Sequence, residues 1–176
     1  HERNEIQAAL HRLQYVMTLD PAPVTGLDIV NTVYGSGFRM KTGELAAELN
    51  AVTDKIEAEY AAGKNIGKKK RILLTGSPSG GAALKVVRAI EANGGVVVCF
   101  ENCSGMKPLD PVDEENPDVY DALARKYLNI GCSCMSPNPN RMALLEKLID
   151  DFKVDGVVDL VLQACHTYNV ETAMVR

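Results

Sequence analysis

The hydrophobic pattern of the chain changes character near residue 67. In residues 1–66, apolar side chains recur every three or four positions, which is the spacing of helices that pack one face on a core. The pattern predicts a helix over residues 2–17, a break at the Asp20-Pro21-Ala22-Pro23 segment, and a second helix over residues 24–34. Thr42 is expected to cap a third helix. The apolar stripe of that third helix comprises Leu45, Leu49, Val52, Ile56 and Tyr60.

Short, continuous apolar runs follow at residues 71–75, 95–100 and 156–162, and each is typical of a buried strand. Helical patterns separate these runs. The first of these helices ends at Asn93-Gly94, the second starts at Asn116-Pro117, and the third starts at Asn138-Pro139. One face of the third helix is formed by Leu145, Leu148, Ile149 and Phe152. Strands that alternate with helices predict an α/β fold with a parallel, Rossmann-like or flavodoxin-like sheet. We therefore expect a helical connecting segment at residues 1–66 and a flavodoxin-like α/β domain at 67–176.

The composition of the chain argues against some classes of function. The 176 residues are 46% hydrophobic, which is enough for one compact domain, and the net charge of −4 argues against a nucleic-acid partner. The one basic run, Lys68-Lys69-Lys70-Arg71, is expected to be a solvated linker. No apolar stretch approaches the ~18 residues of a membrane span, and no signal-peptide pattern is present. The odd number of cysteines, five, fits a reducing cytoplasm.

The two ends of the chain give a further expectation. The sequence begins at His1 directly in a helical pattern and stops at Arg176 inside another, while a sheet of this kind normally has one or two more strands. We therefore expect the chain to be a fragment of a two-domain protein, with its α/β domain incomplete at the C-terminal end.

All five cysteines lie in the second half of the chain. Cys103 follows the second predicted strand, Cys165 follows the last one, and Cys132 and Cys134 precede the helix that returns to the last strand. Because ligands of open parallel sheets bind beyond the carboxyl ends of the strands, we expect these four thiols at one edge. Cys99 lies inside a strand and is expected in the core.

Thiolates bind zinc or iron–sulfur clusters. The CxxC pairs of structural zinc are absent from the sequence, and single cysteines on converging loops favour an iron–sulfur cluster; the alternative is a set of buried free thiols. At the same edge, the turn at residues 75–81 precedes a helix, and it either binds an anion or makes a tight turn. Glu101 and His166 either donate protons near the cluster or fix a loop.

Three runs of sequence resemble one enzyme superfamily. They are GSPSGGAALKVVRAIEANGGVVVCFENCSGMKPLD, KYLNIGCSCMSPNPNR and VDGVVDLVLQACHTYNVET. Together they resemble the 2-hydroxyacyl-CoA dehydratase and benzoyl-CoA reductase superfamily, and most closely its branch of double-cubane cluster proteins. The similarity covers nearly all of residues 68–176, and residues 1–66 resemble more weakly the segment that joins the two α/β halves of those proteins. The resemblance implies two flavodoxin-like domains that meet at a cluster, with this chain containing most of the second.

The resemblance also implies cofactor, partners and roles. It implies that Cys103, Cys132, Cys134 and Cys165 hold an iron–sulfur cluster, either a double cubane or a [4Fe–4S] cluster, completed by cysteines of the first domain. Candidate hydrogen-bond donors to the cluster are Asn102, Ser133, His166 and Ser77, and the expected catalytic residues are Glu101, His166 and Ser77.

The implied activity is low-potential electron transfer to a small-molecule substrate, driven by a separate ATP-hydrolysing iron–sulfur activator, in a homodimer or heterodimer. One alternative is a subunit of a 2-hydroxyacyl-CoA dehydratase, with an acyl-CoA substrate. The other is a non-catalytic electron-transfer or structural subunit.

Overall fold

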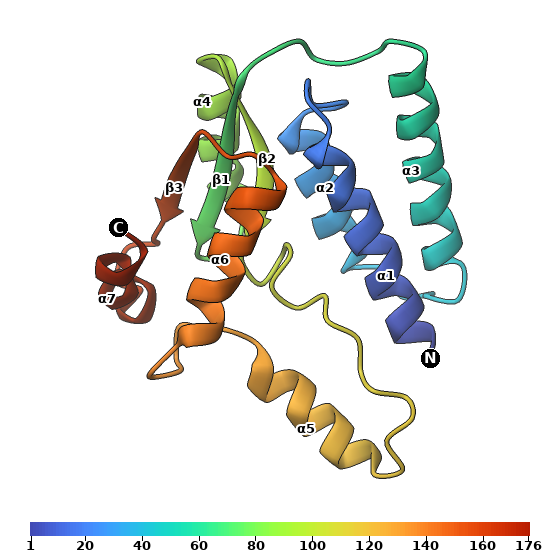
Figure 1. Cartoon of the computed structure of the whole chain (residues 1–176), viewed down its shortest axis with the longest axis vertical. Coiled ribbons are helices and arrows are strands. Elements are labelled where there is room, and N and C mark those ends of the chain that lie inside the picture. The colour runs from blue at the N-terminus through green and yellow to red at the C-terminus, as the bar shows by residue number, and fades with distance from the viewer.

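The structure is a computed structural model that describes the backbone of residues 1–176 and every side chain except that of Ala82. Its first third is helical, as the pattern predicts, and its remainder alternates strands with helices (Figure 1). The α-helices are α1 (Glu2–Tyr15), α2 (Gly26–Ser36), α3 (Leu45–Ala61), α4 (Leu84–Ala92), α5 (Val119–Asn129), α6 (Pro139–Asp151) and α7 (His166–Val175). The strands are β1 (Lys70–Gly76), β2 (Gly95–Glu101) and β3 (Gly156–Leu160), and short 3-10 turns occur at Val16–Thr18 and Gly81–Ala83.

The three strands form one parallel sheet in the order β2-β1-β3. Leu73 of β1 lies opposite Cys99 of β2 and Val157 of β3, so all three strands end at the same edge. β2 is buried along its whole length, which explains its continuous apolar run. The α/β fold class predicted from the sequence is confirmed, and the arrangement is consistent with a flavodoxin-like domain.

Helices cover both faces of the sheet. One core joins α1, α3 and α6 to one face, where Leu73, Val96, Val98 and Cys99 point inward. A second core joins α2 and α4 to the opposite face through Leu74, Val97 and Phe100. In Figure 1, α6 crosses in front of the sheet, α4 lies behind it, and α5 stands apart at the bottom of the view. The helical residues 1–61 therefore share a core with the sheet.

The prediction that the basic run is solvated is wrong for Arg71. Its side chain is buried in β1, and its guanidinium donates to the backbone carbonyl oxygens of Met17, Leu19 and Phe152. Those carbonyls lie at the ends of α1 and α6, where helices leave backbone acceptors without partners. Arg71 therefore attaches both helices to the sheet. Its three hydrogen bonds offset the free-energy cost of burying its charge.

Two cap predictions are also wrong. Thr42 does not cap α3: its hydroxyl bonds the carboxylate of Glu2, and Glu44 occupies the cap position. α5 is capped by Asp118, whose carboxylate accepts the backbone N–H groups of Tyr120 and Asp121, so the helix begins two residues later than Asn116-Pro117 predicts.

The apolar stripe of α3 also differs from the prediction at one position. Val52 is 41% exposed, and Thr53 takes the buried position. The hydroxyl of Thr53 bonds the carbonyl of Leu49 within the same helix, which allows a polar side chain to face the core.

One glycine allows α2 to reach the sheet. A Cβ at Gly26 would lie 2.1 Å from the carbonyl oxygen of Val97 in β2, and the N–H of Gly26 donates to Glu91 at 2.7 Å. The start of α2 therefore packs directly on the strand. The described helices include none with the length and apolar character needed to cross a membrane.

We expect Gly26→Ala to lower the free energy of unfolding by about 1–3 kcal/mol, because the added methyl must displace β2 or the helix. Gly35→Ala is the matched control: it lies in the same helix with no atom within 4 Å of the added Cβ, and it should be neutral or stabilising by about 0.5–1 kcal/mol. Urea unfolding followed by circular dichroism measures both. Equal effects of the two changes would contradict the close packing of α2 on β2.

Candidate functional site

The carboxyl edge of the sheet collects residues from four segments of the chain. Ser77 follows β1, Asn102 and Cys103 follow β2, and Cys165 follows β3 and caps α7. α6 starts at this edge because it runs back toward the start of β3, so the Cys132-Ser133-Cys134 segment just before it lies here too. The topology therefore brings the predicted cysteine segments to one edge.

A buried cluster of charges lies directly beneath this edge. The side chain of Glu101, at the end of β2, is fully buried, and its Oε1 lies 3.0 Å from Nζ of Lys107 in an ion pair without hydrogen-bond alignment. Its Oε2 lies 3.5 Å from Nε of Arg141 and accepts the hydroxyl of Thr75. Arg141 in turn donates to the oxygen of Thr75 at 2.9 Å. Two cations thus enclose one carboxylate, and each charge has a partner.

The same cluster attaches α7 to the edge. Arg141 also pairs with the carboxylate of Glu171, which accepts a hydrogen bond from Asn138 at 2.6 Å. Tyr168, one turn earlier on α7, is buried: its ring lies 4.9 Å from the guanidinium carbon of Arg141 and 5.2 Å from Nζ of Lys107. Charge and cation–π contacts therefore join the start of α6, the loop after β2, and α7.

The sequence analysis named Glu101 but missed its charged neighbours Lys107 and Arg141, and it also missed Glu171. A signal existed for Arg141, because it shares a helix face with Leu145, Leu148 and Phe152 at the positions i+4, i+7 and i+11. A cation on an apolar face indicates a buried anionic partner. Lys107 has no such signal, because it lies in a loop without periodicity.

Cys132 and Cys134 form the closest pair of thiols, with their sulfur atoms 3.4 Å apart. The backbone N–H of Cys134 and its thiol, together with the charge of Lys107, lower the pKa of Cys132. The neighbouring Cys132 sulfur raises the pKa of Cys134. The pair therefore loses its first proton from Cys132, whose partly buried sulfur is the better thiolate ligand.

Cys165 and Cys103 are both neighbours of Tyr168. The backbone N–H of Tyr168 and the hydroxyl of Thr167 lower the pKa of Cys165, with a smaller contribution from Ser77. The sulfur of Cys103, which is exposed, lies 3.9 Å from the hydroxyl oxygen of Tyr168. Burial, with the Cys103 sulfur next to it, raises the pKa of Tyr168, so the phenol keeps its proton.

Cys99 differs from the other four thiols. It is 2% exposed within β2, and burial raises its pKa well above the usual value. It is a core side chain, as its position inside a strand predicts.

The thiols do not converge on a single point. Where the structure describes side chains, no three His, Cys, Asp or Glu lie close enough together to hold one ion. A single-ion site of the structural zinc type, with four protein ligands around one point, is therefore not formed. A cubane cluster, by contrast, is ligated through several irons, so its thiol donors need not meet at one point.

The remaining predicted residues have partners within the protein. The backbone N–H of Ser77 donates to the carbonyl of Leu160, and its side-chain oxygen accepts the N–H of Leu162, so it ties β1 to the end of β3. Asn102 donates to the hydroxyl of Ser79 at 2.9 Å. The carboxylate of Glu101 is occupied by its cations, and the catalytic roles predicted for it and for Ser77 stay predictions.

The turn at residues 75–81 packs closely against its neighbours. A Cβ at Gly76, which has a φ of +102°, would lie 2.3 Å from the carbonyl oxygen of Leu160, and one at Gly80 would lie 2.5 Å from the ring of Tyr34. This geometry is that of a tight turn, the simpler of the two interpretations of this segment.

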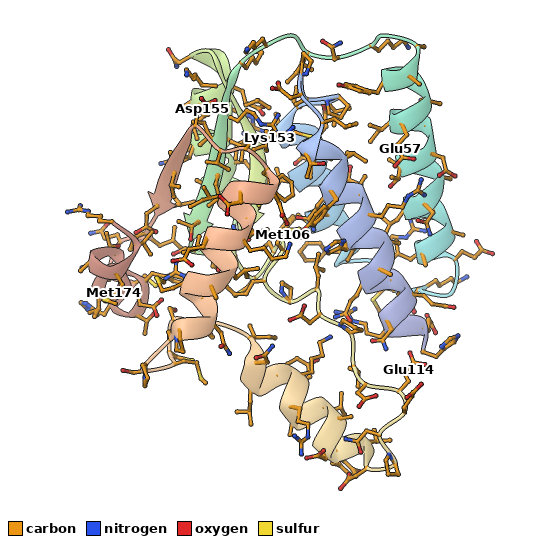
Figure 2. The ribbon with its side chains drawn as sticks, viewed as in Figure 1. Glu57, Met106, Glu114, Lys153, Asp155 and Met174 are labelled. Carbon is orange, nitrogen blue, oxygen red and sulfur yellow. The ribbon has the colours of Figure 1, made fainter. Side chains whose placement is uncertain are left out.

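A cavity of about 770 Å³ opens beside the cysteine pair. The loop of residues 133–139 forms one wall and α7 the other, and Cys134 and His166 both line it. Most of the lining is apolar, and Met174, which Figure 2 shows on α7 at the side of the molecule away from α3, is 72% exposed. A thiol pair, a histidine and an apolar cleft of ligand size thus lie side by side.

These features define an α/β protein with a thiol-bearing strand edge above a buried charge cluster. The family model described as 2-hydroxyglutaryl-CoA dehydratase, D-component, matches residues 1–176, and the chain belongs to this family. It is also 47% identical over 174 residues to a protein of Escherichia coli (strain K12) named "Putative dehydratase subunit YjiM". That match covers 99% of this chain and 45% of the relative, so the chain spans about half the length of the curated relative.

We expect Glu101→Gln to lower the free energy of unfolding by about 3–5 kcal/mol, because it leaves Lys107 and Arg141 buried without their shared counter-charge. Glu57→Gln is the matched control, since Glu57, labelled in Figure 2, pairs with Arg12 on an exposed surface and should cost less than about 1 kcal/mol. Denaturant unfolding of both variants measures the difference. A Glu101→Gln variant as stable as the control would contradict the ion-pair assignment.

Proposed function

We propose that this chain provides half of an iron–sulfur site in a dehydratase-family subunit, with Cys103, Cys132, Cys134 and Cys165 as ligands. The observation that carries the proposal is the placement of four thiols outside the core along one strand edge, above buried cations. Soft thiolate donors of this kind suit iron–sulfur clusters. Further ligands are expected from a region of the full-length protein beyond this chain.

The chain's own residues prepare this edge for a metal cluster. Hydrogen bonds lower the pKa values of Cys132 and Cys165, which favours the thiolate forms that bind metal. The positive charge of Lys107 also lowers the pKa of Cys132, while the carboxylate of Glu171 acts in the opposite direction. When bound, such a cluster supplies one-electron chemistry at low potential.

The apolar cavity beside Cys134 is the proposed place of the substrate's acyl portion. Its volume lies within the range of about 300–1,000 Å³ that small-molecule sites occupy. Met135, Met142 and Met174 line it, and methionine side chains adapt to apolar groups of varied shape. His166, exposed at its wall, is the proposed proton carrier, because the nitrogens of an imidazole ring can both accept and donate a proton.

The names of the matched family and of the Escherichia coli protein contain the words component and subunit. We therefore propose that the full-length protein works in a multi-subunit enzyme, with an ATP-hydrolysing iron–sulfur protein as the source of its electrons. The reaction proposed is the elimination of water from a 2-hydroxyacyl-CoA.

A double-cubane reductase of small molecules is the second candidate. The Cys132–Cys134 contact favours this second candidate. With this pair and two single cysteines, the chain provides four thiols. A single cubane shared with another part of the protein needs fewer ligands than that from this chain. The two candidates differ in metal content, since a double cubane carries twice the iron of a single [4Fe–4S] cluster.

The full-length protein, purified without oxygen, should contain iron and acid-labile sulfide. Single changes to serine at Cys103, Cys132, Cys134 and Cys165 should each lower the iron content, because serine is a poor ligand for these irons. The matched control is Cys99→Ala, which alters a buried thiol and should keep the wild-type iron content. Iron and sulfide analysis with electron paramagnetic resonance provides the readout.

Two results would overturn the proposal. One is a wild-type protein without iron after anaerobic reconstitution. The other is a set of four serine variants that all retain the wild-type iron content.

A further inference from the structure

A chain of polar contacts runs from the buried carboxylate of Glu101 to the sulfur of Cys103. Nζ of Lys107, whose side chain is fully buried, lies 3.0 Å from Oε1 of Glu101 and 3.3 Å from the hydroxyl oxygen of Tyr168. That hydroxyl oxygen lies 3.9 Å from the sulfur of Cys103, within the range of hydrogen bonds to sulfur. Glu101, Lys107 and Tyr168 are all buried, so water competes little for these contacts.

The chemistry of the groups sets the direction of these bonds. An ammonium group can only donate hydrogen bonds, so the oxygen of Tyr168 accepts from Lys107. The O–H of Tyr168 is then free to donate, and the sulfur of Cys103 lies within its reach. Ser133, between Cys132 and Cys134, is a second polar neighbour of the phenol. Tyr168 therefore lies where two of the cysteine segments meet.

The ring of Tyr168 has little freedom to move. The cations of Arg141 and Lys107 both lie against it, and Tyr168 belongs to α7, which the Arg141–Glu171 pair attaches to the edge. Neither cation contacts the sulfur of Cys103 in the way the phenol does. The phenol is thus held in place beside an exposed thiol to which its hydroxyl can donate.

We infer that Tyr168 is a positioning residue for Cys103. The hydrogen bond from Tyr168 to the Cys103 sulfur persists when that sulfur ligates iron, and this bond raises the reduction potential of the cluster. This inference rests on the proposed function. A hydrogen bond to a ligating sulfur withdraws electron density from the cluster and so favours its reduced state. Lys107 acts through Tyr168, because its donation to the phenol oxygen strengthens the phenol as a donor.

The test is Tyr168→Phe in the full-length protein, which removes the hydroxyl and keeps the ring between its two cations. We expect an unchanged iron content and a midpoint potential more negative than that of the wild type, measured by redox titration followed by electron paramagnetic resonance. Tyr120→Phe is the matched control, since Tyr120 is 85% exposed on α5, and its potential should equal the wild-type value.

A second variant tests the same bond without removing it. Site-specific 3-fluorotyrosine at position 168 is a more acidic phenol and a stronger donor, and it should shift the potential in the opposite, positive direction. A purely structural role for Tyr168 would not produce two shifts of opposite sign. This variant also decides the question if Tyr168→Phe fails to fold.

The outcomes separate the two proposals. A wild-type protein that contains iron, with the same potential after Tyr168→Phe and after fluorination, would overturn the inference about Tyr168 and leave the proposed function standing. A wild-type protein that binds no iron would overturn the proposed function, and the inference with it.

Discussion

The carboxylate of Glu101 is the constraint on which the edge of this protein depends. It is buried at the end of β2, where a lone charge would be too costly to keep. Its partners come from distant parts of the sequence: Thr75 from β1, Lys107 from the loop after β2, and Arg141 from α6. Satisfying one charge therefore fixes the relative positions of three segments.

The positions of the thiols follow from this cluster. Lys107 holds the loop that begins with Cys103, Arg141 holds the start of α6 just after the Cys132–Cys134 pair, and Glu171 brings in α7, which Cys165 caps. The apolar cores on the two faces of the sheet build the layers, and one of them extends into the loop after β2 through Met106 and Leu109. Hydrophobic packing thus determines the framework, and the polar contacts join the loops at the edge to one another.

Much of the fold could be predicted from the sequence, because buried parallel strands are continuous apolar runs and the helices between them keep a 3.6-residue period. The burial of Arg71 could not, since its partners are backbone carbonyls whose positions depend on how α1 and α6 end. The edge location of the cysteines followed from topology alone. Their distances did not, because they depend on pairings such as Thr75–Glu101 and Thr75–Arg141, which join residues 26 and 66 positions apart in the chain.

The same reasoning explains the exposed apolar cavity beside Cys134. Its walls are a loop and a helix held by Asn138, Glu171 and Arg141, so the cleft stays open although its lining is apolar. The proposed function requires such an apolar cleft next to the thiols, because it would shield a substrate from water.

The most direct test of the central claim is X-ray diffraction at the iron absorption edge from anaerobic crystals of the full-length protein. The account predicts an anomalous peak at the carboxyl edge of the sheet, in contact with sulfur atoms of Cys103, the Cys132–Cys134 pair and Cys165. Iron bound elsewhere, with these thiols free of metal, would contradict it.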